Sequence, residues 1–218
     1  MSNVAGDPHK ITPSVRFGPP LEDAQAAVVL VHGRGDSPCG ILTLAQELDV
    51  PGVTFIAPQA MGFSWYPLGF MAHQEDNEPW LTSALARVGA AHAEAMSTGL
   101  PTEKTVLMGF SQGACLSLEF AARNAQRYGA VVAYSGGLMG PEGTEFNYSA
   151  SLGGAPVFLG CSDIDFHIPK ARVDESADVM EFLGGQVDKR IYPGMAHTVN
   201  ADELEWARAI LMSLSAFP

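Results

Sequence analysis

The chain has 218 residues and a formal net charge of −12, with 47% hydrophobic and only 17% charged residues. This composition provides a core for one domain over residues 1–218 and excludes disorder for most of the chain. The negative charge argues against a nucleic-acid-binding protein and against stable association with an anionic membrane. We therefore expect a small neutral molecule as the partner.

Cysteine usage and the N-terminus indicate a cytoplasmic protein. Cys39, Cys115 and Cys161 are far apart and show no CxxC spacing, which argues against a zinc site, a dithiol redox site and a disulfide framework. Residues 1–10 lack the apolar core of a secretory signal. No apolar run approaches the roughly 18 residues of a membrane span.

Short apolar segments rich in β-branched residues alternate with helical patterns, and Gly and Pro fall between them. The first half of the chain predicts an edge strand within 9–17, a strand at 26–31, a helix at 41–48, a strand at 53–57, an irregular aromatic loop at 59–79 and a helix at 80–97. The second half predicts a strand at 105–108, a helix at 112–124, strands at 130–134 and 155–159, a helix at 172–183, a strand at 187–192 and a helix at 200–214. Continuous rather than alternating hydrophobicity is typical of strands buried on both faces. The pattern therefore predicts an α/β fold, with a mostly parallel, doubly wound sheet and helices on both faces.

Three local signals refine this pattern. Pro13 cannot donate a ladder hydrogen bond, so the first strand is expected at a sheet edge. The strand at 187–192 is more polar than the others and is also expected near an edge. Asn200 and Glu203 form the capping-box pattern that starts the last helix.

The loop at 59–79 is long, aromatic and irregular. Loops of this length inside a compact domain are usually functional or disordered, and the aromatic rings argue against disorder. We expect Trp65, Tyr66, Phe70 and His73 to form a wall of a substrate groove. The alternatives are that the rings seal the core and that His73 lies at the surface.

The strongest motif is the sequence GFSQG at residues 109–113, which has G-x-S-x-G form and lies between a predicted strand and a predicted helix. A sharp turn at this point lifts the serine hydroxyl off the sheet, and the flanking glycines permit close approach of neighbouring backbone. The N-terminus of the helix supplies a dipole and free N–H groups for a developing oxyanion. The motif therefore predicts Ser111 as a nucleophile.

A serine nucleophile needs a base and an orienting carboxylate, which in this architecture follow it in the order Asp or Glu, then His. Asp163 and Asp165 both follow the strand at 155–159, and His197 follows the last strand. Open α/β sheets place their sites at these carboxyl ends of strands. The spacing by itself leaves both aspartates as candidates.

Four motifs together resemble the carboxylesterase, phospholipase and acyl-protein thioesterase family of small α/β hydrolases, over nearly the whole chain. They are HGRGD at 32–36, GFSQG at 109–113, SDIDFHIP at 162–169 and YPGMAH at 192–197. The resemblance implies an α/β-hydrolase fold, and the short chain leaves no room for a large cap domain. It also implies a catalytic triad of Ser111, Asp165 and His197, and an oxyanion hole made by the backbone N–H groups of Arg34 and Gln112.

Two departures from the family pattern bear on the substrate. Thioesterase members commonly carry Leu at the position of Arg34, and Trp-Phe-Asp where this chain has Trp-Tyr-Pro at 65–67. In both respects the chain looks closer to bacterial carboxylesterases, including hydrolases linked to aromatic-ring metabolism. The resemblance therefore implies the reaction class but not a thioester substrate.

The other histidines have structural interpretations. His32 follows a buried strand and is expected to be a hydrogen-bonded structural residue. His167 lies only two residues after Asp165, and such close neighbours rarely pair as base and orienting group. His9 and His92 are expected to face solvent or to pack against helices.

We therefore expect a serine carboxylesterase that hydrolyses short- to medium-chain esters through an acyl-enzyme, without a metal or cofactor. The alternatives are a lysophospholipase or acyl-protein thioesterase, and a catalytically silent binding module, which usually lacks a triad member. Dienelactone hydrolase is disfavoured because that family has a cysteine where this chain has Ser111. The low charge and the aromatic loop indicate a homodimer.

Overall fold

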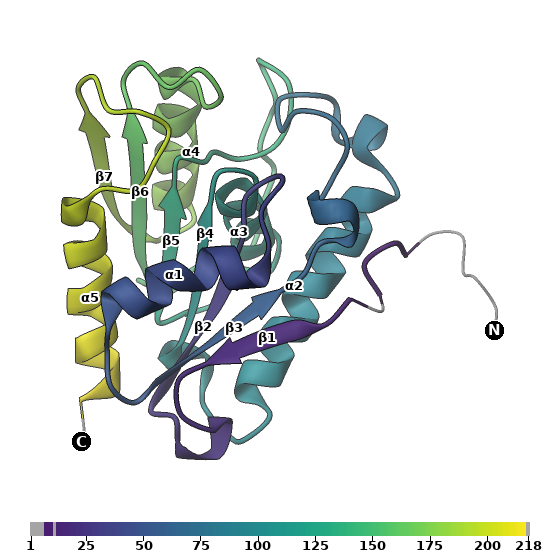
Figure 1. The fold of residues 1–218 in the computed structure, drawn as a ribbon. Helices are drawn as coiled ribbons and strands as arrows, with labels where there is room; N and C mark the ends of the chain where they lie inside the picture. Colours follow the sequence, from purple (N-terminus) through teal and green to yellow (C-terminus); the bar gives the residue numbers. More distant parts are fainter. Residues whose placement is uncertain (1–6, 11, 217–218) are drawn as a thin grey trace.

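Within residues 7–10 and 12–216, which the computed structural model describes, seven strands form one sheet (Figure 1). They are β1 (Ser14–Phe17), β2 (Ala26–Val31), β3 (Val53–Pro58), β4 (Thr105–Phe110), β5 (Ala130–Tyr134), β6 (Pro156–Ser162) and β7 (Gln186–Tyr192). Their order across the sheet is β1-β3-β2-β4-β5-β6-β7. β1 is antiparallel to β3, and the other pairs are parallel. The predicted mostly parallel, doubly wound α/β sheet is confirmed.

Helices cover both faces of this sheet. They are α1 (Pro38–Leu48), α2 (Trp80–Met96), α3 (Gln112–Arg123), α4 (Lys170–Phe182) and α5 (Ala201–Ser215). Short 3-10 turns lie at η1 (Leu21–Asp23), η2 (Met61–Phe63), η3 (Gln74–Asn77) and η4 (Thr102–Lys104). α1 and α5 lie in front of the sheet in Figure 1, and α2, α3 and α4 lie behind it. The described part of the chain carries no additional cap domain over the strand ends.

Two apolar clusters form the core, one on each face of the sheet. Successive residues of β2 alternate between them: Val29 belongs to the cluster under α2, α3 and α4, whereas Val28 and Leu30 belong to the cluster under α1 and α5. All six residues of β2 are buried. This two-sided burial is the physical reason for the continuous apolar runs in the sequence.

Several element boundaries differ from those expected. The strand within 9–17 is shortened to β1, which lies at the predicted sheet edge, and β7 forms the other edge. α1 begins at Pro38 rather than at residue 41, because the Ser37 side chain accepts the backbone N–H of Gly40 and caps the helix. The aromatic loop contains the two turns η2 and η3.

The expected absence of a secretory signal concerns residues 1–10, and residues 1–6 lie outside the described residues. None of the described helices has the length and apolar character needed to cross a bilayer. Over the same residues, no group of three or more His, Cys, Asp and Glu side chains is placed to hold a metal ion.

The connectivity places two loops side by side at the carboxyl ends of the strands. The chain passes from β2 outward to β3 and then returns to β4 on the other side of β2. β2 and β4 pair in parallel, with Val31 opposite Gly109. The loop after β2 and the turn after β4 therefore start at the same level of the sheet, at the point where its winding reverses.

Candidate active site

Ser111 lies in a strained turn between β4 and α3. Its backbone has φ 53° and ψ −119°, a conformation that costs energy for a residue with a side chain and persists only where the surroundings impose it. The Ser111 N–H donates to the carbonyl of Tyr134 (2.9 Å), and its carbonyl accepts from the N–H of Cys115 (3.0 Å). These bonds connect the turn to β5 and α3 and hold the serine hydroxyl above the sheet.

The glycines on either side of the turn are required by close packing. A Cβ at Gly113 would lie 2.1 Å from the carbonyl oxygen of Val31, and a Cβ at Gly109 would lie 2.4 Å from the carbonyl oxygen of Gly113. Either contact is far inside van der Waals distance. The start of α3 therefore approaches β2 and β4 as closely as it does because both positions lack a side chain.

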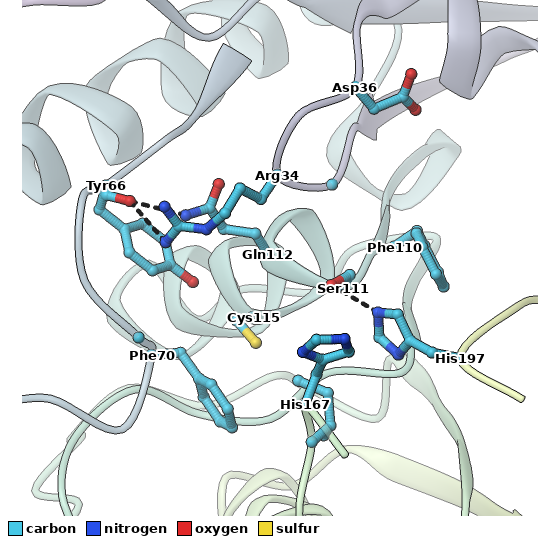
Figure 2. A pocket seen from close by; sticks show the side chains of 13 residues that line it. Arg34, Asp36, Tyr66, Phe70, Phe110, Ser111, Gln112, Cys115, His167 and His197 are labelled. Atoms are coloured by element: carbon cyan, nitrogen blue, oxygen red, sulfur yellow. Dashed lines mark hydrogen bonds between the residues drawn. The ribbon is translucent and has the colours of Figure 1, made fainter. Parts of the chain in front are cut away.

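Three side chains from separate loops form a continuous series of hydrogen bonds. His197 Nε2 lies 2.9 Å from Ser111 Oγ, and His197 Nδ1 lies 2.6 Å from Asp165 Oδ2 (Figure 2 shows the first pair). The imidazole also packs on the Phe110 ring, at a centroid distance of 4.8 Å. This geometry lets His197 accept a proton from Ser111 while Asp165 holds the other ring nitrogen.

The structure pairs His197 with Asp165 and gives Asp163 another role. Burial opposes ionisation of Asp165, but hydrogen bonds from His197 and from the N–H groups of His167 (2.8 Å) and Ile168 (3.1 Å) outweigh it and lower the pKa of the carboxyl. Asp163 instead accepts the N–H of Gly194 (2.8 Å) and supports the loop that carries His197.

The backbone N–H groups expected to form an oxyanion hole are available. Arg34 follows β2, and Gln112 is the first residue of α3, where an N–H has no partner within the helix. Among the described residues, neither N–H donates to a protein acceptor. The dipole of α3 adds positive potential at the same point, next to Ser111.

A cavity of about 540 Å³ opens in front of Ser111 and His197. Apolar side chains form much of its lining; they include Tyr66, Phe70, Phe110, Cys115 and Ile168. Burial raises the pKa of the Cys115 thiol to about 12, so this group is neutral and serves as lining. Such a cavity suits an apolar group held next to a few polar atoms.

Two of the expected substrate contacts do not reach the cavity. Trp65 is fully buried, its indole N–H donates to the carbonyl of His32 (2.8 Å), and its ring packs on those of His9 and His32. The expectation that Trp65 lines the groove is therefore replaced by the alternative, that it seals the core. His73 is exposed and lies outside the cavity lining, whereas Tyr66 and Phe70 line it as expected.

The structural histidines hold the aromatic loop. His32 is buried, with Nδ1 bonded to the carbonyl of Gly33 (2.7 Å) and Nε2 accepting the N–H of Ala60 (3.1 Å). His9 is buried and packs against α2, the second of its two expected places, with its ring centroid 5.5 Å from that of Trp80. Its ring also bonds to the Trp65 carbonyl (2.9 Å) and the Met61 N–H (2.9 Å). Burial lowers the pKa of both imidazoles, so they remain neutral.

The expected site residues omitted His167, which lines the cavity with its ring centroid 4.9 Å from that of His197. The sequence did contain a signal for His167. It lies in the same motif as Asp165, at 162–169, so the turn that brings Asp165 to the site also brings His167 there. His92 is packed as expected, with Nε2 2.9 Å from Thr105 Oγ1.

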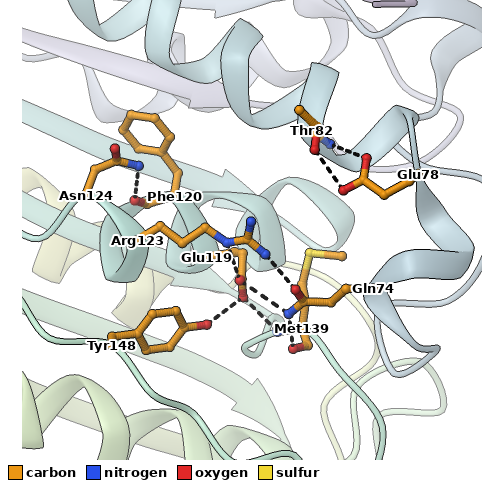
Figure 3. A network of polar contacts seen from close by, with 9 residues as sticks. All are labelled: Gln74, Glu78, Thr82, Glu119, Phe120, Arg123, Asn124, Met139 and Tyr148. Atoms are coloured by element: carbon orange, nitrogen blue, oxygen red, sulfur yellow. Dashed lines mark hydrogen bonds and ion pairs between the residues drawn. The ribbon is translucent and has the colours of Figure 1, made fainter. Parts of the chain in front are cut away.

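A buried carboxylate connects the far end of the aromatic loop to the rest of the domain (Figure 3). Glu119 on α3 bonds to Arg123 (2.7 Å), to the Met139 N–H (3.2 Å) and to the Tyr148 hydroxyl (3.0 Å). Gln74 accepts from Arg123 (2.6 Å) and donates to the Met139 carbonyl (2.8 Å). The loops on both sides of α3 are thereby held to one charged group.

Comparison with known proteins agrees with this geometry. The phospholipase/carboxylesterase family model matches residues 16–215. The chain is 27% identical to an acyl-protein thioesterase 1 from Yarrowia lipolytica over 212 residues, which cover 88% of this chain and 92% of the thioesterase.

Solved structures agree with that match. A phospholipase/carboxylesterase from Dyadobacter fermentans is 41% identical and superposes with a TM-score of 0.88. The match covers 92% of this chain and 96% of the Dyadobacter chain. Esterase PE8 has 26% identity, a TM-score of 0.78, and coverage of 93% and 99%, respectively. The chain thus belongs to the phospholipase/carboxylesterase family of α/β hydrolases.

Proposed function

We propose that the chain is a serine carboxylesterase that hydrolyses short- to medium-chain esters through an acyl-enzyme. The observation that supports this most strongly is the hydrogen-bonded series of Ser111, His197 and Asp165. It lies beside two free backbone N–H groups and a largely apolar cavity. These are the parts that acyl transfer by a serine needs.

In the proposed reaction, Ser111 Oγ attacks the ester carbonyl as His197 Nε2 takes its proton. Asp165 orients the ring and stabilises the imidazolium, and the N–H groups of Arg34 and Gln112 donate to the oxyanion. His197 then gives the proton to the oxygen of the leaving alcohol. Water, deprotonated by His197, attacks the acyl-enzyme and releases the carboxylic acid and Ser111.

Two hollows meet at the catalytic histidine. The cavity of about 540 Å³ offers apolar surface for the acyl group. A smaller hollow of about 290 Å³ also reaches His197 and includes Ile41, Leu44 and Thr198 in its lining. It supplies room for the alcohol part of the ester.

Hydrolysis of p-nitrophenyl esters from acetate to palmitate tests this proposal. Ser111→Ala should lose about 10⁶ in kcat, as expected for a triad nucleophile, while the protein stays folded. Ser213→Ala, on the exposed side of α5, is the matched control and should keep full activity. Activity of Ser111→Ala within tenfold of wild type would refute the assignment, whereas a fluorophosphonate adduct on Ser111 would support it independently.

A second candidate is thioester or lysophospholipid hydrolysis. The observation that favours it is the similarity to the Yarrowia lipolytica thioesterase along most of both chains. Matched oxyesters and thioesters of one acyl group, together with a lysophosphatidylcholine, separate these activities. A catalytically silent binding module would show no turnover with any of them. The homodimer and the cytoplasmic location stay predictions.

A further inference from the structure

We infer that the Arg34 side chain is a specificity-determining residue that limits acyl length by holding one wall of the acyl cavity. Residues 64–70, here called the wall segment, contribute Tyr66, Gly69 and Phe70 to the cavity lining. None of these residues belongs to a helix or strand, so no regular secondary structure satisfies the carbonyl groups of the segment. Its position therefore depends on side chains that bond to it.

Arg34 makes four hydrogen bonds to this segment. Its Nη1 donates to the Ser64 hydroxyl (3.0 Å) and to the Pro67 carbonyl (3.0 Å). Its Nη2 donates to the carbonyls of Tyr66 (2.9 Å) and Leu68 (2.6 Å). Figure 2 shows the guanidinium next to the Tyr66 backbone. Three successive carbonyl oxygens thus converge on one cation.

Because of this convergence, the position of the wall segment depends on the Arg34 side chain. Carbonyl dipoles that point at one place repel one another unless a positive group lies between them, and a guanidinium provides several donors in a rigid fork. Without Arg34 the carbonyls of Pro67 and Leu68 would turn toward water, and the wall segment would move outward. Both terminal nitrogens of the guanidinium donate two hydrogen bonds each to the segment. The role of Arg34 is therefore to position the segment rather than to bind a substrate anion.

Other contacts of the wall segment come from buried residues and do not involve Arg34. Gln112 accepts the Trp65 N–H (2.9 Å) and donates to the Tyr66 carbonyl (2.9 Å). Asn77 accepts the Leu68 N–H (2.9 Å), and the N–H of Gly140 donates to the Phe70 carbonyl (2.8 Å). Because these contacts persist, an Arg34 variant is expected to fold and to release only the outer side of the wall.

Arg34 and residues 65–67 are in direct contact, through the carbonyls of Tyr66 and Pro67. Both residues that supply the oxyanion N–H groups, Arg34 and Gln112, bond with their side chains to the same segment.

The test compares Arg34→Leu, Arg34→Lys and wild type on p-nitrophenyl butyrate and octanoate. Each additional buried methylene is worth about fourfold in kcat/KM, so the four that separate octanoate from butyrate set a ceiling of about 250-fold on the change in the ratio. In Arg34→Leu the ratio of kcat/KM for octanoate to that for butyrate should rise at least tenfold. Arg34→Lys, which offers a point charge without the fork, should give a smaller rise. An unchanged ratio in Arg34→Leu overturns the inference.

Arg208→Leu is the matched control. Arg208 also donates to backbone carbonyls, those of Leu48 (3.0 Å) and Glu47 (2.7 Å) at the end of α1, but it does so away from the acyl cavity. Its removal should leave the chain-length ratio unchanged. A rise equal to that of Arg34→Leu would show a general loosening of the fold and would overturn the inference.

The chain-length ratio rests on the proposed ester hydrolysis, so a second measurement does not use turnover. Hydrogen–deuterium exchange of a peptide covering residues 64–70 should be at least tenfold faster in Arg34→Leu than in wild type and in Arg208→Leu. Equal exchange in the three proteins overturns the inference. If wild type hydrolyses no ester, the proposed function fails, and the exchange result still decides whether Arg34 holds the wall segment.

Discussion

We expect the buried carboxyl of Glu203 to destabilise the folded chain at neutral and alkaline pH. This residue is fully buried at the start of α5, where one carboxylate oxygen accepts the Asn200 N–H (2.8 Å) and completes the capping box. Among the described residues the other oxygen, Oε1, has no hydrogen-bond partner. It lies over Gly160, where a Cβ would be only 2.0 Å away. We expect Glu203→Gln to stabilise the protein, because glutamine preserves the capping box without burying a charge.

The magnitude follows from proton binding. Burial raises the pKa of Glu203 from 4.5 to about 7, so between these values the folded chain binds more protons than the unfolded chain. The stability contributed by this group is fully present below pH 4.5 and is lost as the pH rises through 7. At about 1.4 kcal/mol per pH unit the loss amounts to about 3 kcal/mol. Glu203→Gln should recover most of it at pH 8 and gain little at pH 4.5.

Urea unfolding at pH 4.5, 6, 7 and 8 measures this difference. Glu205→Gln is the matched control, because it removes the same charge from an exposed position of the same helix. It should change the free energy of unfolding by less than about 0.5 kcal/mol at each pH. Equal effects of the two variants, or a Glu203→Gln effect that does not depend on pH, would refute the reasoning.

Three further outcomes are expected. Asp165→Asn should lose about 10⁴ in kcat through the wrong imidazole tautomer, whereas Asp163→Asn should lose far less; equal losses measured with a p-nitrophenyl ester would contradict the pairing. Gly113→Ala should give no folded enzyme by circular dichroism, because its Cβ would overlap a carbonyl of the neighbouring strand; a folded, active variant would disprove that packing. Trp65→Ala should lower the free energy of unfolding by about 3–5 kcal/mol, whereas Phe70→Ala should mainly alter acyl-length preference; the reverse result would restore Trp65 as the cavity residue.

Local sequence was sufficient for the elements that build the site. The turn at Ser111 was predictable because a strand, a G-x-S-x-G sequence and a helix follow one another along the chain. Its position is also fixed by contacts with β2 and β5. The strands were predictable because burial on both faces requires apolar residues at every position. The capping box at Asn200 and Glu203 is likewise contained in four consecutive residues.

The choice of Asp165 over Asp163 could not be made from local sequence patterns. Both residues follow β6, and spacing did not separate them; the family resemblance selected Asp165, and the structure agrees through the 2.6 Å contact with His197. Asp163 turns toward the N–H of Gly194 instead. Two residues on one loop point in different directions according to the backbone path, which neither composition nor periodicity specifies.

The aromatic loop is the part of the site whose arrangement depends most on tertiary contacts. Tyr66 lines the cavity and its neighbour Trp65 is sealed in the core, although their side chains look equally suited to either place. The path of the loop is set by contacts from distant positions, 56 residues away for His9 and 32 for Arg34. The individual strands and the turn that carries the candidate nucleophile Ser111 could be predicted from the sequence, because residues adjacent in the chain encode each of them. The acyl cavity depends on which irregular segment packs against which, and that is decided only when the whole chain folds.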